Sequence, residues 1–113
     1  MVLSKGFEAC LFGYDKNQWE QIAQKQLEDS SVVNINDRDL RRYLFSGAAV
    51  VALDAQGRFV IPPALLEYIG VDDGVAIVGA GDHFEIWKPG IWEKKMREIE
   101  EKGPGNNADR VLT

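Results

Sequence analysis

Residues 53–63 read Leu-Asp-Ala-Gln-Gly-Arg-Phe-Val-Ile-Pro-Pro, and no other stretch of the chain restricts the fold as strongly. Its centre is a turn, because Gly57 adopts positive φ at no steric cost. Residues 58–61 are aromatic and β-branched and predict a strand. Pro63 suits the first position of a helix, and Gly70 suits its left-handed end. The stretch therefore predicts a turn, a strand and a short helix in quick succession.

The turn carries one acid and one base. Asp54 and Arg58 flank it and are close enough in sequence to form an ion pair. A guanidinium group is a planar fork that fits phosphate oxygens or the edge of a guanine. Two interpretations remain open. Either the pair only organises the turn together with Gly57, or Asp54 positions Arg58 for contact with nucleic acid.

Periodicity and turn residues predict the remaining elements, and together they indicate a mixed α/β fold that is mostly β with short helices. Asp15 and Gln18 form a capping-box pattern at the start of a helix that we expect to end near Glu28. A second helix, capped by Asn34 or Asn36, is expected to run to Phe45. The predicted strands lie near residues 2–4, 9–14, 49–53, 58–61, 75–79 and 83–87, and a last helix opens at Pro89.

The second of these helices carries three arginines. Arg38, Arg41 and Arg42 stand at positions i, i+3 and i+4, which places them on one helix face. Such a basic face predicts either a track for phosphates or a subunit contact. The alternative is a solvated face whose arginines pair with nearby Asp and Glu.

Further residues around the motif extend the pattern. Ser46-Gly47-Ala48-Ala49 precedes it, and Glu67-Tyr68-Ile69-Gly70, Val75–Gly79, Phe84–Trp87 and Trp92 follow it. In this order and spacing the chain resembles the second half of the MraZ family, within the AbrB and SpoVT group of swapped-hairpin DNA-binding modules. Gly6, Cys10–Tyr14 and Trp19-Glu20 are similar to the later part of the first MraZ half.

The resemblance implies a swapped-hairpin AbrB-like β-barrel built from two related halves. A shift of 73 residues places Gly6 on Gly79 and Trp19 on Trp92, but it would place a second copy of the turn before Met1. We therefore expect a first half that lacks its start. The expected division is a remnant of the first half at 1–33, a linker helix at 34–47, a second half at 48–102 and a flexible tail at 103–113.

The resemblance also implies a function. It predicts a transcriptional regulator that binds short operator repeats in double-stranded DNA near division and cell-wall genes. The contacts would come from Arg58 and the three linker arginines. Family relatives assemble into rings, so a homo-oligomer is expected, with Trp19, Trp92, Met96 and Ile99 in the core or at the subunit interface.

Composition sets the limits. The chain has 113 residues and a net charge of −5, so binding to DNA requires a concentrated basic patch. We expect a soluble, cytoplasmic, nucleoid-associated protein without cofactor, metal, membrane partner or small-molecule substrate. No catalytic residues are expected, and lone His83 is interpreted as a surface residue. The alternatives are an AbrB- or MazE-like antitoxin or transition-state regulator, and a truncated form that assembles without binding DNA.

Overall fold

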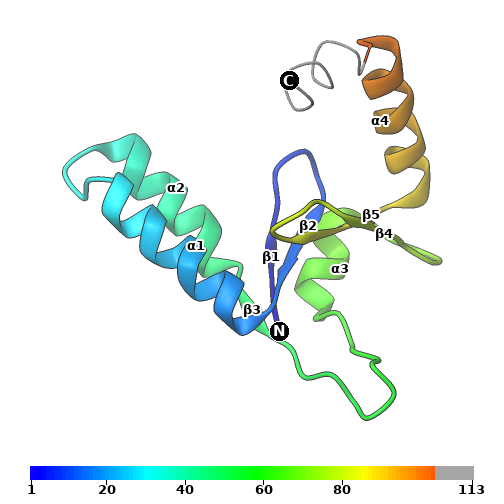
Figure 1. The fold of residues 1–113 in the computed structure, drawn as a ribbon, viewed down its shortest axis with the longest axis horizontal. Coiled ribbons are helices and arrows are strands. Elements are labelled where there is room, and N and C mark those ends of the chain that lie inside the picture. Colours follow the sequence, from blue (N-terminus) through cyan, green and yellow to red (C-terminus); the bar gives the residue numbers. More distant parts are fainter. Residues whose placement is uncertain (104–113) are drawn as a thin grey trace.

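A five-stranded antiparallel sheet lies at the centre of the computed structural model, which describes residues 1–103 (Figure 1). The strands lie in the order β3-β1-β2-β5-β4. The hairpins β1–β2 and β4–β5 lie side by side because β2 pairs with β5, with Leu11 opposite Ile86. Segments that are distant in the sequence therefore share one sheet. The strands are β1 Val2–Lys5, β2 Leu11–Tyr14, β3 Ala49–Val50, β4 Ala76–Gly79 and β5 Phe84–Trp87.

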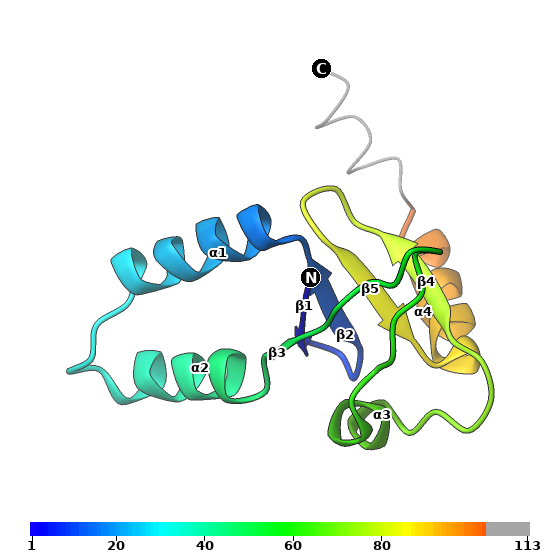
Figure 2. The same cartoon turned by 90° about the horizontal axis from the view of Figure 1, so that it is seen from below.

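Two helices between β2 and β3 form a hairpin that projects away from the sheet (Figures 1 and 2). The predicted capping box starts α1 (Lys16–Asp29): the Gln18 amide donates to Asp15 Oδ1 at 2.7 Å, and the Asp15 amide donates to Gln18 Oε1 at 3.1 Å. Helix α2 (Ile35–Ser46) begins after Asn34, one of the two caps that the sequence allowed. Both starts were predictable because each cap is formed by neighbours in sequence.

The two remaining helices follow prolines. Helix α3 (Pro63–Ile69) begins with Pro63 and ends at Gly70, whose φ of 66° is the left-handed conformation expected there. Helix α4 (Pro89–Glu101) begins with Pro89 and extends from the β5 side of the sheet. The core consists of buried side chains from the sheet, the segment after β3 and α3: Leu3, Leu11, Val51, Leu65, Ile69 and Ile86.

Several predicted strands are wrong in length or existence. The strand predicted at 49–53 is reduced to β3, and residues 58–61 belong to no strand. The prediction of a mostly β protein is also wrong, since the helices have 14, 12, 7 and 13 residues and the longest strands have four. Residues 58–61 have strand-forming side chains, but within residues 1–103 they have no neighbouring strand with which to form a ladder.

The sheet is open rather than closed. Strand β3 pairs only with β1, and β4 pairs only with β5, within the described residues. The closed barrel that the resemblance implies is therefore not seen in this structure. Apart from Gly103, the tail predicted at 103–113 lies outside the described residues. Among the described helices, none is long and apolar enough to cross a membrane.

One close approach joins the two hairpins. Gly13 of β2 lies opposite Phe84 of β5, and a Cβ atom at Gly13 would overlap the Phe84 ring. Only glycine fits under this ring without displacing it. The contact fixes how the β1–β2 hairpin sits against the β4–β5 hairpin.

Candidate nucleic-acid interface

The sequence motif forms an extended arm, residues 51–62, that leaves β3, turns at 54–58 and returns to α3 (Figure 1). Its two ends are anchored. The Val51 amide donates to the Met1 carbonyl at 2.8 Å, and the half-buried side chains of Phe59 and Ile61 pack against the core. Val60, between them, is 81% exposed. Residues 59–61 thus alternate between inward-facing and exposed side chains, as in a strand, although they have no strand partner within residues 1–103.

Asp54 builds the turn through its carboxylate. Oδ1 accepts hydrogen bonds from the amides of Gln56 and Arg58, each at 2.9 Å, and Oδ2 accepts from Arg58 Nε at 2.9 Å. The backbone adds a bond from the Asp54 amide to the Arg58 carbonyl at 2.8 Å. These hydrogen bonds, first that of the Arg58 amide, lower the pKa of Asp54 below its ordinary value. Asp54 is therefore ionised at neutral pH.

Gly57 supplies the conformation that the turn requires. Its φ is 77°, as predicted, and its amide donates to the Asp54 carbonyl at 3.0 Å. All the bonds that hold the turn come from residues 54–58 themselves. The turn is thus locally specified, and it keeps its shape at an exposed position.

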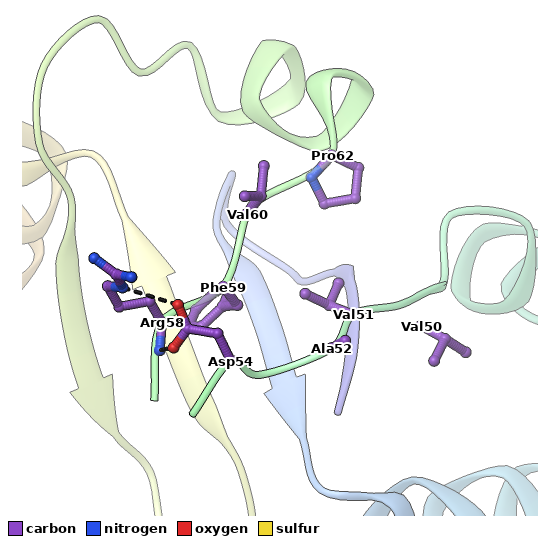
Figure 3. A pocket seen from close by; sticks show the side chains of 8 residues that line it. All are labelled: Val50, Val51, Ala52, Asp54, Arg58, Phe59, Val60 and Pro62. Atoms are coloured by element: carbon purple, nitrogen blue, oxygen red, sulfur yellow. Dashed lines mark hydrogen bonds and ion pairs between the residues drawn. The ribbon is translucent and has the colours of Figure 1, made fainter. Parts of the chain in front are cut away.

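Arg58 is presented to solvent. Its side chain is 74% exposed, and Asp54 holds it only through Nε (Figure 3). Within residues 1–103 the two terminal guanidinium nitrogens make no hydrogen bond or ion pair. The carboxylate therefore orients the group and leaves its outer fork free for an acceptor.

An open hollow of about 620 Å³ lies beside the turn (Figure 3). Its walls are mostly apolar, and Asp54 and Arg58 stand at its rim. Val50, at the end of β3 just before the arm, is 87% exposed. An apolar surface of this kind suits a protein segment better than a phosphate backbone. The lining residues are Val50, Val51, Ala52, Asp54, Arg58, Phe59, Val60 and Pro62.

The linker arginines do not form one free face. Arg38 Nη1 donates to the carbonyls of Val32 and Val33 at 2.8 and 3.0 Å. Arg41 Nε donates to Ser30 Oγ at 2.6 Å, and its Nη2 donates to the Ser30 carbonyl at 2.9 Å. These bonds fasten α2 to the end of α1 and to the loop after it.

Arg42 is the exposed member of the three. Its side chain is 66% exposed and pairs with Asp39 at 3.0 Å, the local pairing that was one of the two alternatives. The arm and the α1–α2 hairpin lie apart in both views (Figures 1 and 2). The structure therefore does not gather the linker arginines around Arg58.

The candidate core and interface residues divide into two groups. Trp19 packs between Tyr14 and Phe45, with ring centroids 5.5 and 5.8 Å apart, and Trp92 packs on Trp87 at 5.4 Å. Met96 and Ile99 on α4 stay exposed at 40% and 39%. The tryptophans thus pack at least partly against aromatic side chains of the same chain, whereas Met96 and Ile99 remain exposed to contact a partner.

Sequence reasoning missed two clusters. The first joins Tyr43 of α2 and Tyr68 of α3, whose hydroxyls lie 2.7 Å apart and both contact the Gly6 carbonyl. The second surrounds His83, whose side chain is only 17% exposed, so the prediction of a surface residue is wrong. The sequence did offer one indication: His83 and Glu85 are two residues apart, so they point to the same face of the predicted strand. Among residues 1–103 no group of three metal-ligating side chains is placed to hold an ion.

Comparison with known proteins identifies the family. A family model described as "MraZ protein, putative antitoxin-like" matches residues 44–113, which is more than half of the chain. Transcriptional regulator MraZ of Roseiflexus castenholzii is 38% identical over 100 residues, which make up 88% of this chain and 69% of the relative. The chain belongs to the MraZ family.

Two further MraZ proteins support this family assignment. Transcriptional regulator MraZ of Syntrophomonas wolfei is 41% identical over 91 residues, covering 80% of this chain and 63% of the relative. The protein of the same name from Thermomicrobium roseum is 34% identical over 112 residues, covering 99% and 78%. The MraZ family model starts at Leu44, so it includes the arm, α3, the β4–β5 hairpin and α4.

Proposed function

We propose that this MraZ family member is a DNA-binding transcriptional regulator that contacts DNA through Arg58. The observation that carries the proposal is the arm, in which an ionised Asp54 orients an exposed guanidinium and leaves its outer fork free. The name of the relatives, transcriptional regulator, supports it. Since those relatives are named as regulators, we propose no enzymatic activity.

The role of Arg58 follows from its geometry. A planar fork with free Nη atoms is matched to the O6 and N7 acceptors of guanine or to two phosphate oxygens. Asp54 removes part of the rotational freedom of the side chain before DNA binds, which lowers the entropic cost of the contact. Because the chain carries a net charge of −5, affinity must arise from such local contacts rather than from overall charge.

We further propose that copies of the chain associate. The outer edges of β3 and β4 are open in the described part of the chain, and exposed apolar residues lie on β3 (Val50), on the arm (Val60) and on β4 (Ile77). Open strand edges and apolar surface favour pairing with another chain. Pairing of this kind would complete the swapped-hairpin barrel of two related halves, 1–33 and 48–102, joined by the linker 34–47. The exposed Met96 and Ile99 offer a second contact, which Trp92 would flank.

Association explains how one arginine per chain suffices. An oligomer, which we propose to be a ring, presents several Arg58 side chains, and tandem operator repeats in double-stranded DNA engage them together. We propose that the DNA sites are repeats near division and cell-wall genes. The protein would bind them at the nucleoid, in the cytoplasm. Arg42 is the linker arginine best placed for an additional phosphate contact, since Arg38 and Arg41 are engaged with backbone carbonyls.

The test is a titration of repeat-containing DNA with matched arginine variants. Arg58→Ala should weaken binding by about 5- to 150-fold, which corresponds to the ~1–3 kcal/mol of a bidentate base contact. Arg58→Lys keeps the charge but loses the fork, so it should recover only part of the affinity. Arg97→Ala removes the same charge from an exposed position on α4 and serves as the control.

The salt dependence separates two modes of contact. If Arg58 binds a phosphate, Arg58→Ala should reduce the slope of log K against log salt by about one per contact and weaken all sequences alike. If it binds a base, the loss should be confined to the cognate repeat. Equal affinities of Arg58→Ala, Arg97→Ala and the unaltered protein would contradict the proposal.

A further inference from the structure

The partly buried His83 lies where the two hairpins meet. It follows the β4–β5 turn, and its ring lies against Phe12 and Tyr14 of β2, with centroids 4.6 and 5.7 Å apart. Tyr14 in turn packs on Trp19 of α1. The imidazole therefore touches β2, β5 and, through Tyr14, the helical hairpin.

Both ring nitrogens face carboxylates. Nδ1 lies 2.7 Å from Asp82 Oδ1, and Nε2 lies 2.9 Å from Glu85 Oε2. An ionised carboxylate only accepts hydrogen bonds, so both contacts are satisfied at once only if both nitrogens carry hydrogen. The geometry thus fits the imidazolium cation and not either neutral tautomer.

The two carboxylates differ in freedom. The Asp82 side chain is 74% exposed, whereas that of Glu85 is 18% exposed and also accepts a hydrogen bond from Trp87 Nε1 at 2.9 Å. Loss of one proton leaves a lone pair facing an anion. Asp82 can turn into water at little cost, so the bond between Nδ1 and Asp82 is the one that breaks.

We propose that His83, Asp82 and Glu85 form a pH-sensitive clamp that holds the β4–β5 hairpin against β2 while His83 is protonated and releases the turn at residues 80–82 when it is not. The proposal stands on the paired distances, the sheltered ring and the position at the junction of the hairpins. It does not depend on the proposed DNA binding.

The protonation energetics agree with this geometry. Partial burial by itself lowers the pKa of His83, but the hydrogen bonds to Asp82 and Glu85 outweigh it and raise the pKa above its ordinary value. The His83 hydrogen bond lowers the pKa of Asp82. A raised pKa means that the stabilisation is complete below the unfolded value near 6.5 and is lost as pH rises through the folded pKa.

Two titratable neighbours of the clamp, Tyr14 and Cys10, stay protonated in the folded protein over that range. Burial raises the pKa of Tyr14 and of Cys10 to about 12 in each case. Lys25 of α1 faces Asp82, and Lys95 of α4, whose pKa is raised first by its hydrogen bond to Glu8, acts on Glu85. His83 is the only histidine of the chain, so its ring signals are assigned without ambiguity. The unfolding profile is compared with that of His83→Gln, because the Cys10 thiol of the unfolded chain, with an ordinary pKa of about 8.5, also titrates between pH 6 and 9 and contributes equally to both proteins.

The experiment is an NMR titration of protein labelled with ¹⁵N-histidine, which reports the protonation of each ring nitrogen. We expect both nitrogens to be protonated at pH 6 and a midpoint above 6.5. Glu85→Gln should lower the midpoint, whereas Glu93→Gln makes the same chemical change at an exposed position on α4 and should leave it unaltered. A neutral tautomer at pH 6, a midpoint at or below 6.5, or equal midpoints for the two variants would overturn the clamp.

Denaturant unfolding gives a second readout at fixed protein concentration. The unaltered protein should lose unfolding free energy as pH rises from 6 to 9, and His83→Gln should show a flatter profile over the same range. Parallel profiles would refute the clamp. If a variant fails to fold, the titration of the unaltered protein still decides.

Discussion

Two turns in this molecule differ in how their backbone conformation is stabilised. The turn of the arm, residues 54–58, places glycine at its positive φ and makes its hydrogen bonds within five residues. The β1–β2 turn, residues 6–10, has positive φ at Glu8 (66°) and Ala9 (61°), where L side chains are disfavoured. A locally specified turn keeps its shape while exposed, whereas a strained one requires support from the rest of the fold.

The β1–β2 turn has two local hydrogen bonds, from the Gly6 amide to the Cys10 carbonyl at 2.8 Å and from Cys10 Sγ to the Phe7 carbonyl at 3.0 Å, and three helices add support from outside the turn. Tyr43 of α2 and Tyr68 of α3 donate to the Gly6 carbonyl at 2.5 and 3.1 Å. Lys95 of α4 pairs with Glu8 at 2.6 Å. The β1–β2 turn is therefore held in place by three helices, whereas the turn of the arm keeps its shape without them and is free to contact a partner.

The largest predicted effect is on the supported turn. Replacing Tyr43 and Tyr68 together by Phe removes both hydroxyl donors from the carbonyl of buried Gly6, and we expect the free energy of unfolding to fall by about 2–3 kcal/mol. Denaturant unfolding measures the loss. Tyr14→Phe is the control, because the Tyr14 hydroxyl makes no hydrogen bond in the described part of the chain. A loss no larger than that of the control would show that the two tyrosine hydroxyls do not stabilise the β1–β2 turn.

A smaller effect is expected at the arm. Gly57→Ala introduces a Cβ at φ 77°, where nothing lies within 4 Å, so the cost is conformational strain of about 1 kcal/mol rather than a clash. The strained turn should alter the position of Arg58 and weaken DNA binding more than it reduces stability. Unfolding and DNA titration of the same variant compare the two. Unchanged affinity with reduced stability would show that the shape of the turn does not matter for binding.

The smallest effect has the opposite sign. Ala9→Gly relieves positive φ at the β1–β2 turn and should raise the free energy of unfolding by about 0.5–1 kcal/mol. Thermal or denaturant unfolding detects it as an increased midpoint. DNA affinity should stay the same, since this turn is assigned no contact. A destabilised variant would show that the Ala9 methyl group contributes more than its strain costs.

The same contrast explains what was predictable from sequence. The Asp15 capping box, the Asn34 cap, the helix start at Pro63 and the Asp54–Arg58 pair depend on neighbours within a few residues, and all were predicted. The strand at 58–61 failed because a strand also needs a partner. The partial burial of His83 was missed because it depends on β2, about 70 residues earlier in the chain. The engagement of Arg38 and Arg41 with carbonyls likewise arises from the way α2 returns along α1.

The central claim is that DNA lies against the arm, and site-directed crosslinking tests it most directly. Cys10 is the only cysteine and is 1% exposed, so a cysteine introduced at an exposed position accepts a photoreactive label selectively. Gln56→Cys places the label at the tip of the turn, and Val33→Cys places it on the α1–α2 loop, where Val33 is 85% exposed. With repeat-containing DNA we predict crosslinks from position 56 and none from position 33. Crosslinks from position 33 alone would contradict the account and place the DNA on the helical hairpin.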